Sequence, residues 1–129
     1  MFISHIQFQA KNASNMLTYL RSIGDSAPVS VDLLTETLLS DGIIPASCAA
    51  DIVTKCFEFS DKSGSGETRR NGVIVISKIV SCHGDTLEEE TVAEVLRRFI
   101  SAMTEGDTEV RRTVAEYLGI VMLASKHSG

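Results

Sequence analysis

The sequence has few cysteines, and the three that it has do not suggest a disulfide framework. Cys48, Cys56 and Cys82 are an odd number and stand within largely apolar runs. Disulfides persist in oxidising compartments, where small secreted domains carry them in paired sets. The cysteine pattern therefore favours a reducing compartment.

The sequence also lacks a basic excess and a long hydrophobic run. Its formal net charge is −5, so it has no surplus of positive charge to displace counterions from nucleic acid. The longest apolar runs, 73–76 and 119–124, are far shorter than the roughly 20 residues that cross a bilayer. The first residues, MFISHIQFQAK, lack the basic and apolar regions of a signal peptide. We expect a cytoplasmic protein with neither a nucleic-acid nor a membrane partner.

Catalytic and metal-binding motifs are missing as well. There is no GxSxG, no HExxH and no glycine-rich phosphate loop, and the three histidines are scattered along the chain. Cys48 and Cys56 lie eight residues apart, which separates them by about 12 Å on a helix and prevents one zinc ion from binding both. We expect no enzyme, no cofactor and no metal.

What the sequence does contain is helical periodicity. Apolar residues recur every three or four positions in six segments that end at turn residues, of which the clearest are Gly24, Gly42 and Gly106. The predicted helices cover residues 3–23, 30–41, 46–60, 69–83, 86–104 and 107–125. Together they predict a single all-α domain.

Residues within these segments predict how the helices begin and which faces they bury. Ser30 and Asp107 are suited to cap helices, and Thr86 with Glu89 forms the pattern of a capping box. The expected apolar face of the segment 30–41 consists of Leu33, Leu34 and Leu38.

One segment allows two interpretations. The β-branched run at 73–80 is typical of a strand. No second run of that kind is present to pair with it, and a lone strand is not stable. A buried helix is the favoured interpretation, and a strand remains the alternative.

The double arginines reveal an internal offset of forty-two residues. At this offset apolar residues fall on apolar residues and turns on turns, across two helices and their connection. The matched pairs are Arg69 with Arg111, Arg70 with Arg112, Ile76 with Leu118, Ile79 with Val121, Val53 with Val95, Phe57 with Phe99, and Gly64 with Gly106. A period near forty built from two helices is typical of an α-solenoid.

The stretch VLRRFISAMTEGDTEVRRTVAEYLGIVML resembles a HEAT repeat or its armadillo relative. The residues that carry the resemblance are Asp107, Val110, Arg111, Ala115, Leu118 and Gly119. The match is best over 86–125, weaker over 46–83 and poor before that. The resemblance implies an α-α superhelix of about three hairpins, near 3–41, 46–83 and 86–125, with the arginine that matches Arg111 bonding across repeats. A compact irregular helical bundle is the alternative fold.

The last helix suggests a function in association. Its apolar residues surround most of its circumference, whereas the terminal helix of a solenoid should have a polar outer face. The predicted interface for a protein partner or a second copy comprises Val114, Tyr117, Ile120, Val121 and Leu123. We expect a non-enzymatic scaffold or adaptor domain. Alternatively, the N-terminal helix covers this face, or the chain belongs to a longer array.

Two rival functions come from residues in the remaining segments. Arg70, Arg98 and Arg112 belong to arginine doublets and would serve an anion- or phosphopeptide-binding domain. The segment that begins at Asp61 resembles an EF-hand loop, with Ser63, Ser65 and Glu67 as further oxygen donors. Its twelfth position, however, is Gly72 instead of the bidentate glutamate of a calcium loop.

Overall fold

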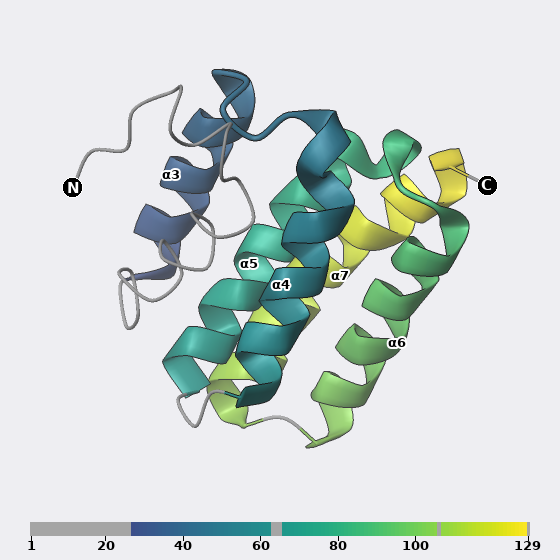
Figure 1. Ribbon diagram of the computed structural model, residues 1–129. Coiled ribbons are helices and arrows are strands. Elements are labelled where there is room, and N and C mark those ends of the chain that lie inside the picture. The colour runs from purple at the N-terminus through teal and green to yellow at the C-terminus, as the bar shows by residue number, and fades with distance from the viewer. Residues whose placement is uncertain (1–26, 63–65, 106, 129) are drawn as a thin grey trace.

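The computed structural model describes residues 27–62, 66–105 and 107–128, and every regular element within these ranges is helical. Five α-helices are present there: α3 (Pro28–Ser40), α4 (Ala49–Lys62), α5 (Gly66–His83), α6 (Glu89–Glu105) and α7 (Thr108–Ser128) (Figure 1). Two short 3₁₀ turns, η1 (Ala46–Cys48) and η2 (Gly84–Thr86), precede α4 and α6. The predicted all-α fold is confirmed for these residues. The predicted helix 3–23 lies outside them.

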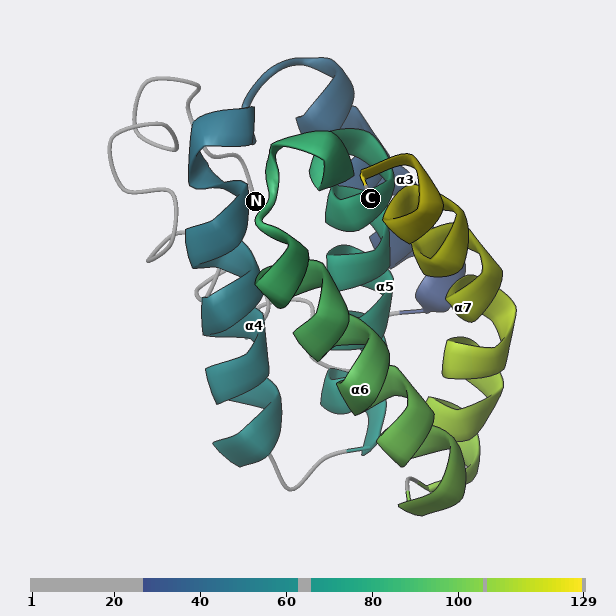
Figure 2. The ribbon, with the colours of Figure 1, turned by 90° about the vertical axis from the view of Figure 1, so that its right-hand side faces the viewer.

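Helix α5 lies at the centre of the arrangement. It packs against α3, α4 and α7, while α6 packs mainly against α7. Figure 1 shows α3 to one side of α5 and α4 in front of it, and Figure 2 shows α4 and α7 on opposite sides of the molecule. Helices α5 and α7 run in the same direction, because Arg70 binds Glu109 near their starts and Gly84 approaches Ala124 near their ends.

The β-branched run of α5 is helical, so the alternative of a strand over 73–80 is wrong. From Arg70 to Val80 every residue except Lys78 is buried. Neighbouring helices cover α5 on several sides, and burial of each large aliphatic side chain stabilises the fold by about 1.5–3 kcal/mol. This contribution exceeds the weak preference of Val and Ile for strands. No helix within the described ranges is long and apolar enough to cross a membrane.

The other helices bury most of the apolar residues that recur at helical spacing, although Met103 of α6 is 40% exposed and α3 buries another face than expected. The buried apolar residues form one cluster, to which α4 contributes Ala49, Ile52, Val53 and Cys56, α6 contributes Val92, Val95 and Phe99, and α7 contributes Val110, Val114, Tyr117 and Val121. Helix α3 buries Val31, Thr35 and Leu39 and leaves Leu33 and Leu34 exposed. Leu38 of the expected face does pack against the core. Leu33 and Leu34 were misplaced because α3 carries apolar residues on both sides, so contact with α5 selects the face.

Two of the predicted helix-end residues have the expected role in the structure, and two do not. Asp107 caps α7, since the backbone N–H of Val110 donates to Asp107 Oδ1 at 3.0 Å, and Gly42 has the positive φ of +74° that suits a residue after a helix. Ser30 is not a cap, because α3 already begins at Pro28. The hydroxyl of Thr86 donates to the carbonyl of His83 at 2.7 Å, so it does not form the expected capping box.

Candidate interaction surfaces

The outer side of α7 carries large apolar residues that no described helix covers. Ile120, Met122 and Leu123 are 37%, 49% and 60% exposed, respectively. Ile120 and Leu123 belong to the predicted interface, whereas Met122 does not. Met122 lies in the same apolar run of the sequence, and that run would have identified it.

The other three predicted interface residues lie elsewhere. Val114, Tyr117 and Val121 point into the core and are almost fully buried. Their assignment to an outer interface is therefore wrong, because the side of α7 that contacts α5 and α6 takes up these residues. The sequence showed apolar residues around most of this helix, and the tertiary structure divides them into a buried side and an exposed side.

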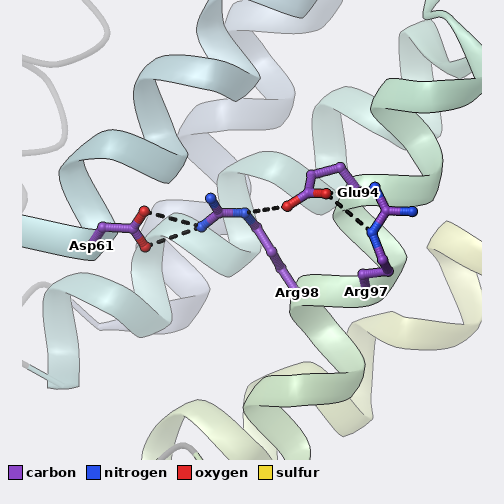
Figure 3. Close-up of polar contacts among 4 residues, drawn as sticks. All are labelled: Asp61, Glu94, Arg97 and Arg98. Atoms are coloured by element: carbon purple, nitrogen blue, oxygen red, sulfur yellow. Dashed lines mark hydrogen bonds and ion pairs between the residues drawn. The ribbon is translucent and has the colours of Figure 1, made fainter.

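Arg98 of α6 joins that helix to α4 through two carboxylates. Its Nε donates to Glu94 at 3.1 Å, and its Nη1 lies 3.0 Å from Asp61 Oδ1 (Figure 3). Its guanidinium also stands over the ring of Phe57, 4.1 Å from the centroid, which adds a cation–π contact. Partial burial by itself would lower the pKa of Arg98, but hydrogen bonds and charges from Asp61 and Glu94 outweigh it and raise that pKa.

Glu94 is shared between neighbouring arginines. Arg97 donates to it from Nε and Nη2, and these bonds together with those from Arg98 lower the pKa of Glu94 (Figure 3). The ion pairs of Arg98 are partly solvated, and such pairs contribute about 0–1 kcal/mol each. The ion pairs with Glu94 and Asp61 therefore fix the orientation of Arg98 more than they stabilise the fold.

A pocket of about 140 Å³ lies beneath Arg98, between α4 and α6. Its walls are mainly apolar and come from four helices, and its charged rim includes Arg69 and Asp61. Arg69 donates to Asp107 Oδ2 at 3.1 Å. Each arginine of the rim therefore already has a carboxylate partner, and the pocket has no surplus of positive charge with which to attract an anion.

The three arginines of the predicted anion site do not line this pocket together. Arg70 is 6% exposed and donates to Asn71 and Glu109, and Arg112 lies 3.6 Å from the same Glu109. Arg98 pairs with other carboxylates, as described above. The structure thus groups Arg98 with Arg69 and places Arg70 and Arg112 at Glu109.

A second polar group links α3, α5 and α7. The hydroxyl of Tyr117 donates to Asp32 Oδ2, and Lys78 Nζ lies 3.1 Å from Asp32 Oδ1 and 2.5 Å from Glu36 Oε1. Partial burial would lower the pKa of Lys78, but the hydrogen bonds to Glu36 and Asp32 outweigh it and raise that pKa. The spacing of residues within single helices could not have revealed this group, because its members come from three helices.

The segment of the predicted calcium loop has another conformation where it is described. Asp61 lies in the last turn of α4 and binds Arg98, and α5 begins at Gly66 and includes Glu67 and Gly72. Nine of the twelve positions from Asp61 to Gly72 are helical, two at the end of α4 and seven at the start of α5, and such a segment cannot wrap around a cation as a loop. Ser63 and Ser65 lie outside the described residues. In the described part of the chain no cluster of acidic, histidine or cysteine residues has the geometry of a metal site.

The cysteines differ in environment. Cys56 is fully buried in the core, and burial raises the pKa of its thiol to about 12. It therefore stays protonated at neutral pH and fills core volume. Cys48 is partly buried, Cys82 is exposed, and none of the three cysteines is disulfide-bonded.

Comparison of the chain with models of protein families, with curated proteins and with solved structures finds no match. The fold and these surfaces are therefore the basis for an argument about function.

Proposed function

We propose that this protein is a non-enzymatic interaction domain, a scaffold or adaptor that associates with a second copy or another protein through the outer side of α7. The observation that carries the proposal is the exposure of Ile120, Met122 and Leu123 within a single turn of one helix. Contiguous apolar surface of this kind is typical of association sites. A cytoplasmic setting, in which cysteines stay reduced, is part of the proposal.

A HEAT-like stack of hairpins is the architecture that we propose for this function. Its support lies in the joint between the hairpins α4–α5 and α6–α7. Asp107 caps α7 through Oδ1 and accepts from Arg69 through Oδ2, so the turn of one hairpin bonds to the second helix of the preceding one. Arg69 matches Arg111 at the forty-two-residue offset, and the family resemblance implies such a bond for this arginine.

The close packing of this joint gives further support to the stack. A side chain at Gly66 would collide with the carboxylate of Asp107, so glycine permits α5 to begin against the next turn. Helices α5 and α7 then lie side by side and in the same direction. In a stack, the side of α7 away from α5 is where the next element would pack. That place is open in the described residues.

The dimensions of α7 suit an interface. A helix of 21 residues is about 31 Å long, enough to form the centre of a standard interface of about 800 Å² on each partner. Two copies would meet around a two-fold axis, so that the same residues serve on both sides.

The test is the mass of the chain in solution. We expect light scattering at high micromolar concentration to give a mass above the 14.0 kDa of one chain. Leu123→Glu should return the monomer, because it places a charge at the centre of the apolar surface. Ile100→Glu is the matched control, since Ile100 is 58% exposed on α6 and lies outside this surface.

Two results would contradict the proposal. A wild-type monomer at this concentration that also fails to capture a protein partner through α7 removes it. An equal loss of association in Leu123→Glu and Ile100→Glu assigns the effect to general solubility. Val121→Glu is unsuitable for this test, because Val121 is fully buried and its replacement would unfold the chain.

A further inference from the structure

An apolar cleft of about 240 Å³ separates α3 from α7 and meets α7 at Glu116 and Tyr117, about one turn before Ile120. Its lining residues are Pro28, Val29, Asp32, Leu33, Glu116 and Tyr117. Val29 and Leu33 stand one turn apart on α3 and are 70% and 61% exposed. Two large aliphatic side chains on one face of a helix, left in water, form an unpartnered apolar surface.

The base of this cleft is held in place by polar bonds. Tyr117 of α7 donates to Asp32 of α3, and Asp32 in turn pairs with Lys78 of α5. The two helices that form the walls are thus bonded directly to each other, and α3 is also bonded to α5. A preformed cleft loses little conformational freedom when a ligand binds, which favours affinity.

The charge around the cleft is negative. Asp32 and Glu116 line it, and Glu36 follows about one turn after Asp32 on α3. Lys78 pairs with Asp32 and Glu36, whereas Arg112, one turn before Glu116 on α7, pairs with Glu109. Three carboxylates and one ammonium leave two negative charges in excess, in a protein whose net charge is −5. A cationic ligand is favoured by this field, whereas phosphate, nucleic acid and anionic lipid are repelled.

We propose that the α3–α7 cleft binds a basic amphipathic helix of a partner protein. The apolar face of that helix packs on Val29 and Leu33. Its lysine or arginine side chains pair with the carboxylates of Glu116 and Glu36, and the carboxylate of Glu36 also binds Lys78 through Oε1. Apolar contact supplies most of the affinity, and the carboxylates set the orientation and select against acidic helices. This site goes beyond the proposed function, since it requires no self-association.

The probe is a synthetic 18-residue peptide of leucine and lysine, with leucine at helical spacing on one face and a fluorescent label at one end. Its binding to the full chain is followed by fluorescence anisotropy. We expect saturable micromolar binding that weakens as salt rises. A peptide with glutamate in place of each lysine should bind at least about tenfold more weakly, because it meets the same carboxylates as like charges.

Two matched pairs of variants locate the binding. Leu33→Gln should weaken binding about tenfold, whereas Leu34→Gln should change it less than about twofold, because Leu34 is exposed on α3 but does not line the cleft. Glu116→Lys should weaken binding about tenfold, and Glu90→Lys, the same charge change on α6, less than about threefold. All four positions are exposed, and circular dichroism verifies that each variant folds.

Three results would overturn the proposal. They are the absence of binding up to 1 mM peptide, equal effects within either matched pair, and equal affinity for the acidic peptide.

A further result would assign the cleft to a segment of this chain instead of a partner protein. Residues 1–24 include Lys11 and Arg21 but no acidic residue. If a peptide of this segment binds tighter than the leucine–lysine peptide and loses affinity in the same variants, the cleft belongs to the chain's own N-terminal segment.

The outcome is separable from that of the proposed function. Leu33→Gln should keep the mass of the wild-type chain in light scattering, and Leu123→Glu should keep the affinity for the basic peptide. If either variant loses both self-association and peptide binding, the two surfaces are one site, and the assignment of a separate peptide site is wrong.

Discussion

Helices α5 and α7 occupy positions forty-two residues apart that correspond to each other, yet their environments differ. Val80 of α5 is fully buried, whereas its counterpart Met122 of α7 is 49% exposed. The arginines show the same contrast, since the side chain of Arg70 is 7% exposed and that of Arg112 is 71% exposed. Helix α5 has neighbours on both sides, while α7 has α5 and α6 and an open outer side. The exposed apolar residues of α7 thus follow from its place at the end of the described arrangement.

The largest expected difference between α5 and α7 is the loss of stability when an isoleucine of each helix is replaced by alanine. Ile79→Ala removes a fully buried side chain of α5 and should lower the free energy of unfolding by about 2–5 kcal/mol. Ile120→Ala, the same change on the exposed side of α7, should cost less than about 1 kcal/mol. Urea denaturation followed by circular dichroism measures both. Equal costs would show that α7 is as enclosed as α5 in solution.

Replacement of Arg70 and of Arg112 should give a smaller difference in stability. Arg70→Met removes charged hydrogen bonds to Asn71 and Glu109 from a buried position and should destabilise the chain by about 2 kcal/mol. Arg112→Met removes a solvated pair with Glu109 and should change stability by less than about 0.5 kcal/mol. Urea denaturation at low and at high salt is the measurement. A larger loss in Arg112→Met would place the structural role on α7 instead of α5.

The smallest effect concerns Tyr117, whose counterpart on α5 is the apolar Val75. Burial, together with the hydrogen bond to Asp32, raises the pKa of Tyr117 above its ordinary value of about 10. The folded chain therefore holds the phenolic proton more tightly than the unfolded chain does. Its contribution to stability is complete below about pH 10 and is lost as the pH rises further.

Tyr117→Phe tests this contribution. The variant should lose about 1 kcal/mol at pH 7, the net value of one hydrogen bond, and should lose less stability than the wild type above pH 10. Thermal unfolding at pH 7, 9 and 10.5 provides the measurement. An unchanged alkaline slope in Tyr117→Phe would mean that the link between α3 and α7 does not depend on this proton.

Sequence periodicity predicted the individual helices better than the contacts between them. The stripe of Ile52, Val53 and Cys56 on α4 is apolar on one side only, so the side that faces the core could be identified in advance. Asp107 could be identified as a cap because capping is a local interaction within one turn. Leu33 was misplaced because α3 is apolar on both sides, and the charged rim formed by Arg98, Asp61 and Arg69 joins residues from three helices.

By itself, the sequence determined that the described part of the chain is helical, about where its helices lie and which sides of α4 and α6 are apolar enough to be buried. These properties depend on the spacing of residues along one helix, which every chain carries in its order of residues. Only the tertiary structure decided that Arg70 is buried while Arg112 is solvated, that Tyr117 points inward to Asp32, and that Leu33 stays in water beside Glu116. These outcomes depend on which helices become neighbours, because burial is a property of the surface that two helices share.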